Sequence, residues 1–174
     1  GMTAGMMVSI TKAGLYGIPA IPTDQITNRL NRVIKNIELG TNRMALNVSY
    51  FKNRQVQFTS AGMPPAYHCS STSGQVKEIL QVGLPLGGIQ GERYSQEEHP
   101  FESGDTLVFL SDGLPEAENS KGDMLGYESV MDCICDNKNK DVETIKNSLL
   151  DLGDNWLNGV PLQDDITIVV VKKK

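Results

Sequence analysis

The stretch that decides the fold is TLVFLSDGLPEAENSKG, residues 106–122, in which an apolar run meets an Asp-Gly pair and then a polar, turn-rich tail. Its threonine, valine and phenylalanine favour extended backbone, so residues 106–111 are predicted to form a buried strand. Asp112 and Gly113 follow directly, and this pair is common in turns. Taken alone, Asp112 is therefore either a turn residue or one half of a site, and spacing does not decide between the two.

A second apolar strand is predicted for ITIVVV, residues 166–171, which follows Asp164 and Asp165. Its continuous β-branched run is typical of a central strand. If the two strands are antiparallel neighbours, the end of the first lies beside the start of the second, and the acids converge. Two carboxylates about 4 Å apart repel by about 4 kcal/mol at an effective dielectric near 20, so such a pair needs a proton or a cation. Oxygen ligands favour magnesium or manganese, which commonly act on phosphates.

The remaining patterns predict four helices and several short strands. The helices are expected at 3–16, from residue 23 to a stop at Gly40, at 126–136 and at 141–157, and the further strands at 43–51, 55–61, 66–69, 75–80 and 93–99. Strands joined by such short turns are antiparallel. The order of two helices, several strands, two helices and one strand indicates an α+β fold with helices packed on sheet, as a single domain over residues 1–174.

Two helices have the clearest apolar faces. Thr23 or Asp24 is the expected N-cap of the second helix. The apolar face of this helix is predicted to consist of Ile26, Leu30, Val33, Ile34 and Ile37. The apolar face of the last helix is predicted to consist of Val142, Ile145, Leu149, Leu152 and Trp156.

The composition excludes several classes of partner. The net charge of −5 argues against a general binder of nucleic acids or anionic membranes. No apolar run approaches the length that spans a bilayer, and no signal-like start is present. The three cysteines, Cys69, Cys133 and Cys135, suit neither a disulfide framework nor a zinc site, and we interpret them as reduced thiols of a cytoplasmic protein. His68 and His99 have no partner at ligand spacing, which favours surface or core roles.

Several segments in a fixed order carry a family resemblance. They are TSAGMPPAY at 59–67, GLPLGG at 83–88, GDTLVFLSDGLPEAEN at 104–119, MLGYE at 124–128 and QDDITIVVV at 163–171. Together they resemble the bacterial PPM-type serine/threonine phosphatases of the sporulation stage II protein E class, over nearly the whole chain. The resemblance implies an α-β-β-α sandwich of antiparallel sheets flanked by helices.

The resemblance also implies a site. Asp112 and Asp164 correspond to the catalytic, metal-ligating carboxylates, Gly113 to the residue that allows a close turn in the metal site, and Asp165 to a group beside the metal. In this family two Mn²⁺ or Mg²⁺ ions activate a water that attacks the phosphorus of a phosphoserine. The implied substrate is a phosphorylated signalling protein, and in this family it is usually an anti-sigma-factor antagonist. Such a protein is the expected partner, with neither nucleic acid nor membrane involved.

One family motif is absent. The chain begins after the position of a GD-x-x-GHG motif, whose aspartate bridges both metals, and the strands before that motif are absent too. Loss of these strands predicts an exposed sheet edge, through which a homodimer could form. The expected function is a metal-dependent phosphoserine phosphatase domain with impaired activity, and the alternative is a non-catalytic binding module of the same fold. A shortened chain, a proteolytic fragment and a natural protein that has lost catalysis all remain open.

The loop at 116–123 has two interpretations. It leaves the first acid-bearing strand directly, so it is a candidate cover for the active site and a place where substrate choice could be set. An ordinary solvated loop is the other interpretation.

Overall fold

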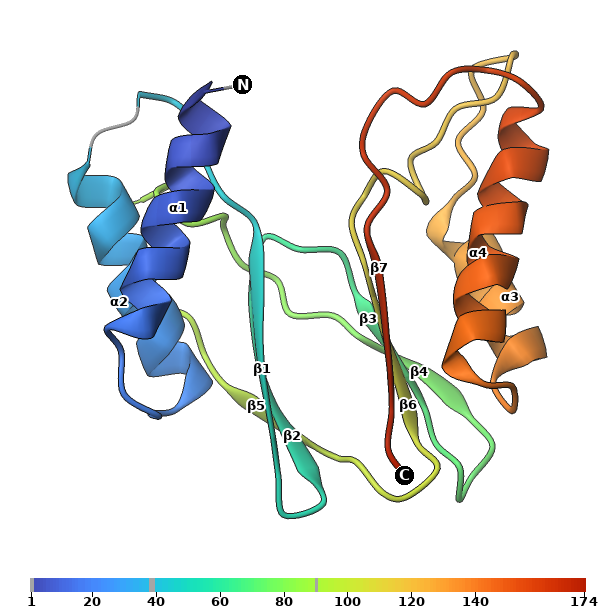
Figure 1. Cartoon of the computed structure of the whole chain (residues 1–174), viewed down its shortest axis with the longest axis horizontal. Helices are drawn as coiled ribbons and strands as arrows, with labels where there is room; N and C mark the ends of the chain where they lie inside the picture. Colours follow the sequence, from blue (N-terminus) through green and yellow to red (C-terminus); the bar gives the residue numbers. More distant parts are fainter. Residues whose placement is uncertain (1, 38–39, 90) are drawn as a thin grey trace. The chain divides into compact units, whose positions relative to one another are not determined.

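The structure is a computed structural model that describes residues 2–37, 40–89 and 91–174 (Figure 1). Its elements confirm the predicted order of two helices, antiparallel strands, two helices and a last strand. The described residues fall into two compact units, one within 1–63 and 81–100 and the other comprising 64–80 and 101–174. The single domain expected from the sequence stays a prediction. No helix among the described residues is long and apolar enough to cross a membrane.

The first unit packs two helices against a three-stranded antiparallel sheet. Its elements are α1 (Met2–Tyr16), α2 (Thr23–Asn36), β1 (Leu46–Lys52), β2 (Gln55–Ala61) and β5 (Glu97–Pro100), with the strand order β1-β2-β5. Asn53 and Arg54 join β1 to β2 with φ angles of 51° and 63°, the left-handed values that tight hairpin turns require. The predicted hairpin is therefore confirmed, although β1 begins three residues later than expected.

The start of α2 differs from the prediction. Pro22 occupies the N-cap position and offers no side-chain acceptor, so neither Thr23 nor Asp24 is the cap. Both lie in the first turn instead, where the Thr23 hydroxyl shares a 2.7 Å hydrogen bond with the hydroxyl of Thr59. The helix ends at Asn36, before the predicted stop at Gly40, and residues 38–39 of the predicted helix lie outside the described residues.

The buried face of α2 is also more polar than predicted. Leu30 and Ile34 are buried as expected, but Val33 is 40% exposed and Ile37 38% exposed. Three polar side chains take part in the buried face instead, namely Thr23, Thr27 and Asn31. Asn31 shows why this is tolerated, since its Oδ1 accepts a 2.8 Å hydrogen bond from the Gly87 N–H. A polar residue whose partner lies far away in sequence can thus replace an apolar one.

The second unit packs two helices against a four-stranded antiparallel sheet. Its elements are β3 (Ala66–Cys69), β4 (Val76–Ile79), β6 (Thr106–Leu110), α3 (Tyr127–Asn137), α4 (Val142–Leu157) and β7 (Ile168–Lys172), with the strand order β4-β3-β6-β7. In Figure 1, α3 and α4 lie side by side next to this sheet. The core between them consists of Tyr67, Cys69, Val108, Leu110, Leu114, Leu125, Val130, Ile134, Ile145 and Leu149.

The prediction that residues 166–171 form a central strand is wrong for the described part of the chain. There β7 pairs with β6 alone and so forms the edge of its sheet. Ile168 and Val170 pack on the core, whereas Val169 is 47% exposed. A β-branched run indicates an extended strand that is apolar on both faces. It does not reveal whether that strand pairs with one neighbouring strand or with two.

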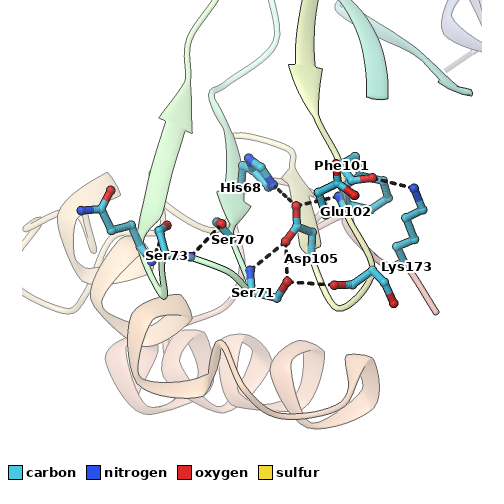
Figure 2. A network of polar contacts seen from close by, with 10 residues as sticks. His68, Ser70, Ser71, Ser73, Phe101, Glu102, Asp105 and Lys173 are labelled. Atoms are coloured by element: carbon cyan, nitrogen blue, oxygen red, sulfur yellow. Dashed lines mark hydrogen bonds and ion pairs between the residues drawn. The ribbon is translucent and has the colours of Figure 1, made fainter. Parts of the chain in front are cut away.

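A buried carboxylate fixes the start of β6 (Figure 2). The Asp105 side chain is only 2% exposed. It accepts hydrogen bonds from the N–H groups of Ser71 (2.7 Å) and Glu102 (2.8 Å), and it lies 3.0 Å from the His68 Nε2. Burial acts to raise the pKa of Asp105, but the bonds from Glu102, Ser71 and His68 outweigh it, so that this pKa lies below its ordinary value. His68 therefore takes part in the hydrogen-bond network of a buried carboxylate.

Asp105→Asn is expected to lower the free energy of unfolding by about 2 kcal/mol at pH 7, because an amide cannot accept from all of these donors. A lowered folded-state pKa stabilises the protein above the unfolded pKa of about 4 and loses that effect as pH falls through the folded value. The difference between wild type and variant should therefore shrink at pH 3, as urea unfolding at the two pH values would measure. Asp132→Asn, an exposed change on α3, is the control. A constant difference at both pH values contradicts the prediction.

Candidate active site

Asp112 follows β6, and hydrogen bonds continue beyond the last residue of that strand. The Ser111 N–H donates to the Thr167 carbonyl (3.0 Å), and the Thr167 N–H donates to the Ser111 Oγ (2.9 Å). The Ser111 hydroxyl in turn donates to the carbonyl of Asp165 (3.1 Å). Since β6 and β7 are antiparallel neighbours, as predicted, these bonds hold Asp164 and Asp165 beside the segment that carries Asp112.

Gly113 allows the two segments to approach each other closely. A Cβ atom at this position would lie 2.5 Å from the carbonyl oxygen of Asp165 and 3.4 Å from that of Asp164. Both are backbone atoms, so rotation of a side chain cannot relieve the overlap. The close turn that the family resemblance implies at Gly113 therefore has a steric reason in this structure.

Asp112 and Asp164 line one pocket of about 150 Å³. Its walls come from the loop after β6 and from the segment before β7: Asp112, Gly113, Glu116, Ala117, Glu118, Met124, Gln163 and Asp164. Both acids are solvent-exposed. The structure thus brings them together, as the pairing of their strands predicts. Asp165 lies outside this lining, and its N–H donates to the Asp164 Oδ1 (2.7 Å), which orients that carboxylate.

The pocket lining also contains residues that were not predicted as site residues from the sequence, namely Glu116, Ala117, Glu118, Met124 and Gln163. The Gln163 Nε2 donates to the Glu118 Oε2 (3.3 Å), and the Tyr127 hydroxyl lies 3.5 Å from the Glu116 Oε1. Burial raises the pKa of Tyr127, and the negative charges of Glu116 and Asp112 raise it further. The one sequence feature that pointed to this wall was the position of the 116–123 loop directly after the acid-bearing strand.

The donor set suits one hard cation better than two. Among the described residues, no three or more histidine, cysteine, aspartate or glutamate side chains form a group that could hold a metal ion. Asp112 and Asp164 supply oxygen donors to a single pocket, and Mg²⁺ is commonly bound by one or two carboxylates while it keeps several waters. The two acids therefore fit one such ion.

The comparisons with known proteins agree with this fold. The family model for stage II sporulation protein E (SpoIIE) matches residues 1–174. The chain therefore belongs to the SpoIIE family, whose fold is that of the PP2C, or PPM-type, phosphatase domains.

Three known proteins illustrate the relationship. The chain is 27% identical over 181 residues to the phosphoserine phosphatase RsbU of Bacillus subtilis (strain 168), covering 100% of this chain and 52% of that protein, so it spans about half the length of this relative. The SiaA-PP2C domain of Pseudomonas aeruginosa superimposes with a TM-score of 0.85 at 17% identity, covering 99% of this chain and 70% of that one. The catalytic domain of the phosphatase PstP in complex with two manganese ions superimposes with a TM-score of 0.69 at 15% identity, covering 95% of this chain and 80% of that one.

Proposed function

We propose that this chain is a metal-dependent phosphoprotein phosphatase domain that hydrolyses phosphoserine or phosphothreonine. The observation that carries the proposal is the single pocket lined by both Asp112 and Asp164. Membership of the SpoIIE family and the likeness to the phosphoserine phosphatase RsbU support it. No cysteine or histidine in the pocket lining offers a nucleophile, which favours direct attack by water over a covalent enzyme intermediate.

In this proposal Asp112 and Asp164 ligate Mn²⁺ or Mg²⁺. Gly113 keeps their segments in contact, and Asp165 orients the carboxylate of Asp164 through its N–H. When bound, the metal supplies Lewis-acid activation of a water and neutralises charge on the phosphate. A pocket whose two proposed ligands fit one ion is consistent with weak activity.

Hydrolysis of para-nitrophenyl phosphate in the presence of Mn²⁺ tests the proposal directly. Activity that rises with Mn²⁺ and disappears with excess chelator is expected, because the two carboxylates lack a neutralising partner without a cation. A rate that is indifferent to both additions would remove the idea.

The alternative is a non-catalytic module that keeps the fold and recognises a partner. The specific observation in its favour is the lack of a three-ligand group among the described residues. Calorimetric titration with Mn²⁺ separates the two proposals. Tight binding of an ion that Asp112→Asn abolishes favours the enzyme over the module, and no binding up to millimolar Mn²⁺ contradicts the enzyme.

The substrate proposed here is a phosphorylated protein, and the family resemblance favours an anti-sigma-factor antagonist. We further propose a homodimer through the free edge of β7, where Val169 is 47% exposed. Light scattering that shows only monomer at high concentration would exclude this homodimer.

The three free cysteines support a reducing compartment, and we place the domain in the cytoplasm. A disulfide in protein isolated from cells under thiol-blocking conditions would contradict that location.

A further inference from the structure

The loop after β6 forms a small hairpin, Ala117–Leu125, which we call the recognition hairpin. Glu118 and Met124 form an antiparallel bridge across it, and the Leu125 N–H donates to the Ala117 carbonyl (3.0 Å). At its tip, the Asn119 Oδ1 accepts from the N–H of Lys121 (2.8 Å) and from that of Asp123 (3.1 Å). These internal bonds give the hairpin a defined conformation.

Trp156, near the end of α4, fastens this hairpin to the helix. Its indole Nε1 donates to the carbonyl of Ala117 (3.0 Å) and to that of Asp123 (3.2 Å). One N–H group therefore binds both sides of the hairpin. The sequence predicts Trp156 only as a core residue, and its ring does pack against the core of the second unit. An amphipathic side chain of this kind combines apolar packing with a directed hydrogen bond.

The hairpin forms one wall of the proposed active-site pocket. Ala117, Glu118 and Met124 line this pocket together with Asp112 and Asp164. Met124 is 57% exposed, a large apolar side chain left in contact with solvent beside the two acids. A small phosphate ester needs only the two acids and their metal, whereas a protein segment that carries phosphoserine must also lie against this wall.

The charge of the wall limits what can lie there. Glu116 and Glu118 are in the lining in addition to the two proposed metal ligands, and no lysine or arginine is. A metal ion held by Asp112 and Asp164 would leave the charges of both glutamates without a cationic side chain in the pocket lining. They therefore attract positive charge beside the phosphoserine and repel negative charge.

We propose that the recognition hairpin reads the residues that flank the phosphoserine, that it favours segments with positive charge there, and that Trp156 is its positioning residue. This inference rests on the proposed phosphatase function. It assigns Trp156 no contact with the substrate, because the indole acts by holding Ala117 and Asp123.

The test uses the whole 174-residue chain with saturating Mn²⁺ and two fluorescently labelled phosphoserine peptides that differ only in arginine or glutamate flanks. Anisotropy gives their affinities whether or not the chain turns over. Wild type is expected to bind the arginine-flanked peptide about tenfold more tightly. Glu118→Gln should reduce this preference without changing the fold, because the amide is isosteric.

Trp156→Phe keeps an aromatic ring but removes the N–H that binds the Ala117 and Asp123 sides of the recognition hairpin. We expect it to raise the dissociation constant of the arginine-flanked peptide about fivefold. The rate of para-nitrophenyl phosphate hydrolysis should stay within about twofold of wild type. Leu152→Ala is the matched control, since it removes another partly buried side chain of α4 from the same core. It should lower the melting temperature and leave the peptide preference intact.

Three outcomes overturn the inference: equal affinity for both peptides, no measurable binding of either, or an unchanged preference in Trp156→Phe. Failure of the phosphatase proposal itself appears elsewhere, as indifference of the para-nitrophenyl phosphate activity to metal. The two failures are therefore distinguishable.

Discussion

Replacing Asp112 by asparagine is expected to reduce Mn²⁺-dependent hydrolysis of para-nitrophenyl phosphate by about a hundredfold or more. The amide preserves the shape of the side chain but lacks the charge that a hard cation needs from its ligands. Removing a group that merely supports a metal ligand typically costs about 10- to 100-fold, so removal of a ligand should cost at least the upper figure. Asp164→Asn should behave alike, since its Oδ1 can still accept from the Asp165 N–H. Steady-state rates over a Mn²⁺ series measure both.

The control for these variants is Asp132→Asn on α3, which changes an exposed carboxylate outside the pocket lining. Its activity should stay within about twofold of wild type, as expected for a surface change away from the site. Melting temperatures in chelator should not fall in either pocket variant, because removing one of two neighbouring negative charges relieves repulsion. Wild-type rates in Asp112→Asn at every Mn²⁺ concentration would show that this carboxylate ligates no essential metal.

Gly113→Ala is expected to have the second large effect. Its added Cβ would meet the backbone of Asp165 at 2.5 Å, so the segment before β7 has to move away. Overpacking of this kind typically costs about 1–3 kcal/mol, and the same movement separates Asp164 from Asp112. We therefore expect both a lower free energy of unfolding in urea and loss of the Mn²⁺-dependent activity.

Gly5→Ala in α1 provides the comparison, because a Cβ there meets nothing within 4 Å and alanine favours helix. It should be neutral or stabilise the protein by up to about 1 kcal/mol. If Gly113→Ala unfolds and reacts like wild type, the close contact between the two segments does not position the acids.

The sequence predicted the elements that build the pocket because their patterns are local. The alternation around Asn53 and Arg54 specified a hairpin, and the apolar runs of β6 and β7 specified two strands with acids at adjacent ends. The family resemblance then suggested the roles that we propose for Asp112 and Asp164. Strand pairing explains why these two acids share a pocket, so this part of the site followed from the sequence.

The parts that the sequence missed depend on distant partners. Asn31 is buried on α2 because Gly87 donates to it, and no periodicity in the helix reveals that bond. Trp156 looked like a core residue because its spacing does not show that two loop carbonyls lie within reach of its indole. The edge position of β7 was not predicted for a related reason. The residues of a strand do not show how many other strands pair with it.

The pairing of β6 with β7 also has a kinetic consequence. Both helices of the second unit lie between these strands in the sequence, so their pairing closes a long stretch of chain. Contacts between residues so far apart in sequence form slowly, because closing the loop costs chain entropy before the strand pairing contributes favourable free energy. We expect the local β1–β2 hairpin to appear early in refolding and manganese affinity to appear late, together with full protection of the β6 amides from hydrogen exchange.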